Sequence, residues 1–144
     1  MKRLITSGVI VTVLGLLIAL GPRFLFKVCA IGEDGVSHCH WSAQAELGVG
    51  FLIAGLGACI LVFTDQKTHL GLLIGAFLAG IIALAIPNAL IGGCHMMEMA
   101  CRRIAFPALT VESVILLIFT AAVVIINEIK HSSTPRPPSY IPPA

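Results

Sequence analysis

Charge is scarce in this sequence. Only 11% of its 144 residues are Asp, Glu, Lys or Arg, whereas a soluble domain carries about 25%. Hydrophobic residues make up 58%, and the mean hydropathy is +1.01, so the chain lacks the polar surface that a fold in water requires. The net charge is +2 without a basic stripe, which argues against a nucleic-acid partner. We therefore expect a membrane protein.

Two motifs that often carry membrane redox or metal chemistry are also missing. The sequence has no Cys-x-x-Cys pair and no His-x-x-x-His pair. Quinone-coupled four-helix oxidoreductases use a Cys-x-x-Cys at the mouth of the bundle, with a lowered thiol pKa. The absence of a Cys-x-x-Cys pair counts against an enzyme of that kind.

Long apolar runs are what the sequence does have. They cover residues 4–20, 47–63, 70–91 and 108–126, each close to the roughly 20 residues that cross about 30 Å of hydrocarbon. The backbone must satisfy its own hydrogen bonds there, so we expect helices. The predicted fold is an all-α integral membrane four-helix bundle over residues 1–130. A proline-rich tail, 131–144, follows and is predicted not to be helical.

The connections predict the topology. The short polar turn 64–69 makes the second and third runs antiparallel, so the loops around 21–46 and 92–107 share the opposite side. Lys2 and Arg3 precede the first run, which places both termini and the turn in the cytoplasm. A cleaved signal peptide is the alternative for the first run, but Gly21-Pro22 follows it rather than a cleavage site. The predicted location is an inner or plasma membrane, crossed several times.

The two outer loops contain most of the cysteines, as expected on an oxidising side. We predict two disulfides among Cys29, Cys39, Cys94 and Cys101, with Cys59 free. A hairpin turning at Asp34-Gly35 would place Cys29 opposite Cys39. Cys94 and Cys101 would then pair only if 92–101 is not helical, because a regular helix separates them by about 10.5 Å. Pairing between the two loops remains the alternative.

A metal site competes with the disulfides. Imidazole, thioether and thiolate groups together suit Cu(I) or zinc, and the same loops hold His38, His40, His95, Met96, Met97 and Met99. Their spacing is loose, and two disulfides would leave no thiolate for a metal. We therefore predict structural disulfides, and neither a metal nor a cofactor.

Carboxylates and arginines lie close to the same outer boundary: Glu46, Glu98, Glu112, Arg102 and Arg103. Glu46 and Glu112 are expected near helix starts, where an acid complements the helix dipole. Acids within membrane helices also mark ion and proton sites. The functional alternative is therefore an ion, proton or partner contact.

Small residues recur on two runs, Gly50, Ala54 and Ala58 on the second and Gly71, Gly75 and Ala79 on the third. Such stripes let membrane helices approach closely, and we expect these two to pack against each other. Pro87 should kink or unwind the outer end of the third helix.

Several segments together resemble a family of small bacterial four-helix membrane proteins known only as a domain of unknown function. They are 39–46 (CHWSAQAE), 98–102 (EMACR) and 106–109 (FPAL), and the resemblance covers residues 4–126. It implies a bacterial or archaeal inner-membrane protein. It also implies work beside ABC transporters of the macrolide-exporter type, and it assigns no catalytic residue.

The predicted function is a small non-enzymatic subunit or accessory protein of a transport complex, with an ABC-type permease as a candidate partner. Its expected partners are the lipid bilayer and another membrane protein or a second copy of itself. One alternative is a membrane thiol or metal-dependent oxidoreductase that uses the outer cysteines. Another is an oligomeric small channel or transporter.

Overall fold

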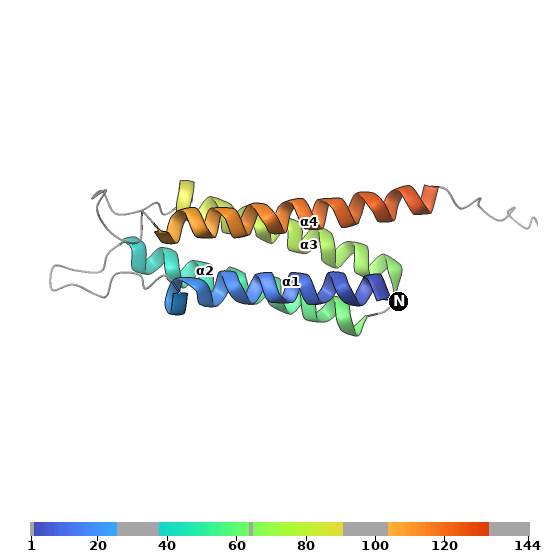
Figure 1. Cartoon of the computed structure of the whole chain (residues 1–144), viewed down its shortest axis with the longest axis horizontal. Helices are drawn as coiled ribbons and strands as arrows, with labels where there is room; N and C mark the ends of the chain where they lie inside the picture. Colours follow the sequence, from blue (N-terminus) through green and yellow to red (C-terminus); the bar gives the residue numbers. More distant parts are fainter. Residues whose placement is uncertain (1, 26–37, 64, 91–103, 133–144) are drawn as a thin grey trace, which may run out of the picture.

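Four helices lie side by side in the computed structural model, which describes residues 2–25, 38–63, 65–90 and 104–132. Side chains are described for 5–22, 24, 40–63, 65–90 and 104–129. The helices are α1 (Lys2–Leu20), α2 (His38–Val62), α3 (Gln66–Ala85) and α4 (Phe106–Ser132). They run alternately up and down along one axis (Figure 1). The prediction of an all-α fold with four helices is confirmed.

Three of these helices are long and apolar enough to cross a membrane: His40–Val62, Gln66–Leu90 and Phe106–Ile129. The apolar stretch of α1, Ile5–Leu20, is shorter than such a span. It nevertheless lies beside α2 along the bundle (Figure 1). Multi-pass membrane insertion is thus supported for α2, α3 and α4, and a fourth crossing by α1 stays a prediction.

Close backbone contact joins α1 to α2. A Cβ atom on Gly15 would meet the Ala54 nitrogen at 2.4 Å, and one on Gly57 would meet the Thr12 nitrogen at 2.5 Å. Gly50 packs equally closely on Ala19. Only glycine leaves room for two helices at this distance.

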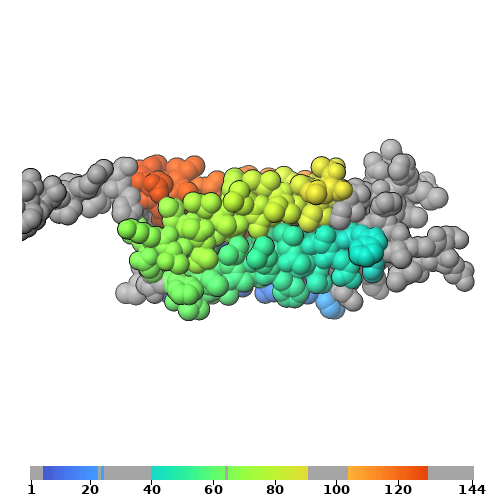
Figure 2. Space-filling model, turned by 180° about the vertical axis from the view of Figure 1, so that it is seen from behind, coloured from blue at the N-terminus to red at the C-terminus, as the bar shows by residue number. Residues whose placement is uncertain are grey.

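The predicted partner of the second helix's small-residue stripe was therefore wrong. Gly50 and Ala54 face α1 rather than α3, and Ala58 is exposed. On α3, a Cβ at Gly75 would make an ordinary contact with Leu56, whereas Gly71 has open space around it. The contact between α2 and α3, seen from behind in Figure 2, thus relies on larger side chains.

The start of α2 corrects a second prediction. The helix begins at His38, nine residues before the predicted 47. Cys39 is therefore helical and does not lie on the second strand of a hairpin. Hydropathy finds where a helix meets hydrocarbon, and a helix can continue for several polar turns beyond that point. The Cys29–Cys39 pairing itself lies outside the described residues, apart from the Cys39 backbone.

Both ends of α3 have identifiable causes. Asp65 is the N-cap, and its Oδ2 accepts hydrogen bonds from the Thr68 backbone N–H at 3.2 Å and the Thr68 hydroxyl at 3.1 Å. These bonds hold the pKa of Asp65 below its ordinary value. At the other end, Pro87 lies in a π-helical turn, η2 (Ile86–Leu90), which confirms its predicted effect. A similar turn, η1 (Gly21–Leu25), follows α1.

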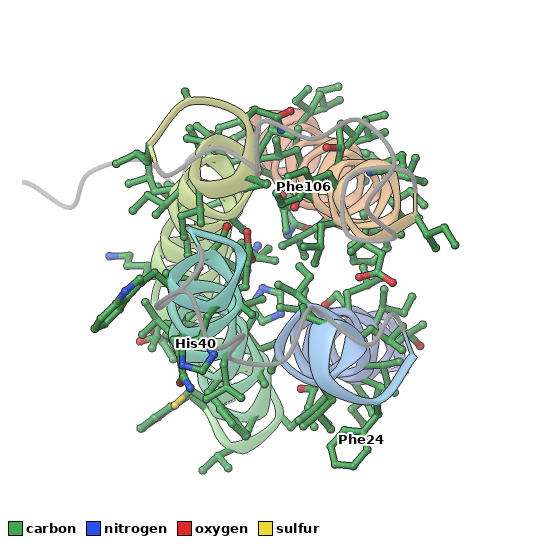
Figure 3. All side chains as sticks on the ribbon, turned by 90° about the vertical axis from the view of Figure 1, so that its left-hand side faces the viewer. Phe24, His40 and Phe106 are labelled. Atoms are coloured by element: carbon green, nitrogen blue, oxygen red, sulfur yellow. The ribbon has the colours of Figure 1, made fainter. Side chains whose placement is uncertain are left out.

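The core is apolar and lies between all four helices. Its fully buried members include Val11 of α1, Ile53 of α2, Leu73 of α3 and Leu116 of α4. Helix α4 continues to Ser132, beyond the predicted end at 126, so the first two residues of the predicted tail are helical. Residues 133–144 lie outside the described part. Phe24 and Trp41 are exposed, and Figure 3 shows Phe24 pointing away from the bundle.

Candidate functional site

An acid and a hydroxyl lie on one inner face of α2. Glu46 is fully buried and Ser42, one turn earlier, is 2% exposed. Residues four apart on a helix are neighbours, and side chains lean toward the helix N-terminus. The Glu46 carboxylate therefore extends toward the turn that carries Ser42. Neither carboxylate oxygen of Glu46 has a hydrogen-bond partner, and neither does the Ser42 hydroxyl.

A matching acid and hydroxyl come from α4. Ser113 is fully buried and its hydroxyl has no partner, and Oε2 of the half-buried Glu112 is also buried without one. Glu46 and Glu112 are thus the two acids in the described part of the chain with buried carboxylate oxygens that lack a partner. The starts of α2 and α4 lie at the same end of the bundle (Figure 1).

Each pair lies within the first three turns of its own helix. Glu46 is about 12 Å along α2 from His38, and Ser113 is about 10 Å along α4 from Phe106, at about 1.5 Å per residue. Figure 3 looks along the bundle from this end. We call Ser42, Glu46, Glu112 and Ser113 the acid–hydroxyl cluster.

The helix-dipole explanation for the two acids does not hold. Neither α2 nor α4 has an acidic residue in its first turn. Glu46 is eight residues past the start of α2, beyond the reach of the dipole's first turn. Burial of an unpaired carboxylate is costly unless a proton, a cation or a donor neutralises it. The buried Glu46 carboxylate therefore needs a proton, a cation or a hydrogen-bond donor.

The remaining predicted site residues fall outside this cluster. Cys29, Cys94, Cys101, His95, Met96, Met97, Met99, Glu98, Arg102 and Arg103 lie outside the described residues, and so do the side chains of His38 and Cys39. His40 is half-buried and packs edge-on against Trp41, with ring centroids 6.4 Å apart. Cys59 is a free, half-buried thiol. Within the described ranges, no three His, Cys, Asp or Glu side chains are grouped as a metal site requires.

One buried polar contact was not predicted. His69, in the first turn of α3, is 1% exposed, and its Nε2 lies 3.3 Å from the hydroxyl of Ser7 on α1. The sequence suggested a polar turn there. The available signal was spacing, because His69, Leu73, Ala76 and Ala83 all fall on the buried face of α3.

Fold and site together indicate an all-α, multi-pass membrane protein with a buried acid, Glu46, near one end of its bundle. The chain belongs to the family described as Domain of unknown function (DUF4418), whose model matches residues 11–126. The matched range contains α2, α3 and the whole acid–hydroxyl cluster. No match was found among curated proteins or among solved structures.

Proposed function

We propose that this protein is a small, non-enzymatic membrane subunit or accessory protein of a transport complex. The observation that supports this most is the outer face of α4. Along its length runs a stripe of exposed residues spaced alternately four and three apart, here called the α4 stripe: Val111, Ile115, Ile118, Ala122, Ile125 and Ile129.

The composition of the α4 stripe favours a protein partner over lipid alone. All its members except Ala122 are β-branched, so they have few rotamers to lose when another helix packs on them. Spacing of four and three also presents one continuous seam to a facing helix. The exposed residues of α2, by comparison, mix Trp41, Phe51, Leu52 and Leu61. The partner we propose is the membrane-embedded permease of an ABC-type exporter, as the family resemblance implies.

Site-specific photocrosslinking in native membranes tests this proposal. A photoreactive residue at Ile118, which is 66% exposed, should crosslink to a larger membrane protein. The matched control carries the photoreactive residue in place of Leu116, which is fully buried on the opposite side of α4. Mass spectrometry of the Ile118 product should identify a transporter permease.

Two results would contradict this function. One is an Ile118 probe that reacts with lipid alone. The other is a crosslink only to a second copy of this chain, which would replace the accessory role with self-assembly. Purification in mild detergent provides an independent measurement, because an accessory subunit should co-purify in fixed stoichiometry with its permease.

A thiol oxidoreductase is the second candidate, supported by the position of Cys39. It is the second residue of α2, and a helix N-terminus favours the thiolate form of a cysteine. Reaction of the native protein with a disulfide substrate, lost in Cys39→Ser, would support this candidate. A Cys39→Ser variant with unchanged thiol reactivity would exclude it.

A further inference from the structure

One acid lies on the buried side of α2. Residues spaced three or four apart along this helix form a stripe that is buried throughout, here called the α2 stripe: Ser42, Glu46, Gly50, Ile53, Gly57 and Ile60. We infer that Glu46 is a proton-binding site, which holds a proton while the bundle is closed around it and releases the proton when water reaches it. This inference does not depend on the α4 stripe or on a transport partner, so either proposal can fail without the other.

Burial without a partner is the first support. Glu46 is fully buried, and neither of its carboxylate oxygens has a hydrogen-bond partner. An ionised carboxylate in this position has lost its water and has no bond in its place, which costs far more than taking up a proton. Acids inside membrane helices are rare for this reason, and they often mark proton sites.

The lack of a compensating charge is the second support. Among the side chains that the structure describes, Lys67 is the one lysine or arginine. It belongs to the first turn of α3, at the opposite end of the bundle from the start of α2 (Figure 1). Glu46 is about 24 Å along α2 from the Val62 end at which that turn lies. No described cation therefore neutralises the Glu46 carboxylate.

The elements packed against α2 supply no other titratable partner. They are α1, α3, η1 and η2. The described side chains of α1, η1 and η2 include no titratable group, and on α3 the titratable groups are Lys67 and His69, both in its first turn. The remaining titratable groups described towards this end are His40, which is half-buried against Trp41, and the half-buried acid Glu112 of α4.

A metal ion is a poorer fit to Glu46 than a proton. Within the described ranges, no three His, Cys, Asp or Glu side chains come together as a metal site requires. The other polar member of the α2 stripe is Ser42, so this face of α2 offers one carboxylate and one hydroxyl. Ca²⁺ takes about six to eight oxygens, whereas a proton needs only the carboxylate.

Reversible unfolding in mixed micelles at several pH values tests the site. The unfolded chain exposes Glu46 to water, where it ionises, so the folded chain holds one more proton. The stability of the wild type should therefore fall from mildly acidic to mildly alkaline pH, with the unfolding constant rising up to about tenfold per pH unit. Glu46→Gln, a neutral side chain of the same shape, should lack this slope. The matched control is Glu128→Gln, which removes an exposed acid and should keep the slope.

Infrared spectroscopy of the folded protein keeps the test valid if Glu46→Gln does not fold. A carbonyl band of a protonated carboxylic acid at neutral pH, present in the wild type and in Glu112→Gln and lost on unfolding, supports the site. A wild type without this band would overturn it, and so would a pH slope that persists in Glu46→Gln. Stabilisation of the wild type by Na⁺ or Ca²⁺ at constant ionic strength, and not by acid, would overturn the proton assignment in favour of a cation.

Discussion

Asp65 stabilises the first turn of α3 through two bonds to one residue, Thr68. Replacing it with alanine should lower Tm, because the Thr68 N–H then loses its acceptor. The Asp65 pKa is lowered in the folded protein, so its contribution is complete above the unfolded-state value of 3.8. It should disappear as the pH falls through the lower folded-state pKa. Thermal unfolding of wild type and Asp65→Ala from neutral to acidic pH measures this.

The matched variant for this prediction is Asp65→Ser, which keeps a side-chain oxygen that can cap the helix. It should recover most of the lost Tm and should show little pH dependence from this position. A difference between wild type and Asp65→Ala that stays constant well below pH 3.8 would mean that the stabilisation does not depend on the charge of Asp65.

Burial of individual polar residues was only partly predictable. His69 continues the apolar spacing of α3, so a helix predicted to begin at Gln66 would have placed His69 on the buried face. Glu46 offers no such signal. Its burial depends on how α2 packs against helices that are distant in sequence. Spacing identifies a helix face, but it does not identify what that face meets.

At the scale of the element, Gly57 determines how closely α1 and α2 pack. A Cβ there would lie 2.5 Å from the Thr12 backbone nitrogen, and a backbone atom cannot move aside as a flexible side chain can. Gly57→Ala should therefore destabilise the protein by about 1–3 kcal/mol, the usual cost of overpacking. Reversible unfolding in mixed micelles measures the change.

Gly55 provides the control on the same helix, because a Cβ there meets nothing within 4 Å. Gly55→Ala should stabilise the protein by about 0.5–1 kcal/mol through the greater helix propensity of alanine. If the two variants change stability alike, the close α1–α2 contact is not what the glycines contribute.

The helices themselves were largely predictable, since each long apolar run became the centre of one. Their ends were less so. The first two turns of α2 contain His40, Trp41 and Ser42, which hydropathy cannot distinguish from a loop. The partner of each small-residue stripe was also undetermined, because Gly50 and Ala54 would suit any neighbouring helix.

For the whole molecule, the predicted orientation places both termini and the α2–α3 turn in the cytoplasm. A cysteine introduced at Gln66, an exposed residue at the start of α3, should react with a membrane-permeant thiol reagent and not with an impermeant one added outside. The control is the same substitution at Phe24, exposed beyond the other end of α1, which should react with both. Outside labelling at Gln66 would reverse the topology.

Disulfides among the outer cysteines are also a prediction for the whole chain. Protein from an oxidising compartment, denatured without reductant, should alkylate at Cys59 alone, because its thiol is free. Peptide mapping of the remaining cysteines should give two bonded pairs and decide their connectivity. Alkylation of Cys29, Cys39, Cys94 and Cys101 under the same conditions would exclude the disulfides. A metal site at those thiols would then be the alternative to test.

The glycine contacts between α1 and α2 also bear on motion. These helices touch through backbone atoms at Gly15, Gly50 and Gly57, so they cannot slide or rotate without a steric clash. At Gly80 of α3, by contrast, the neighbours are the side chains of Leu116 and Leu117 of α4, which can change rotamer. Helices α1 and α2 should therefore stay fixed relative to each other. If the bundle changes conformation, we expect α3 and α4 to move relative to α1 and α2.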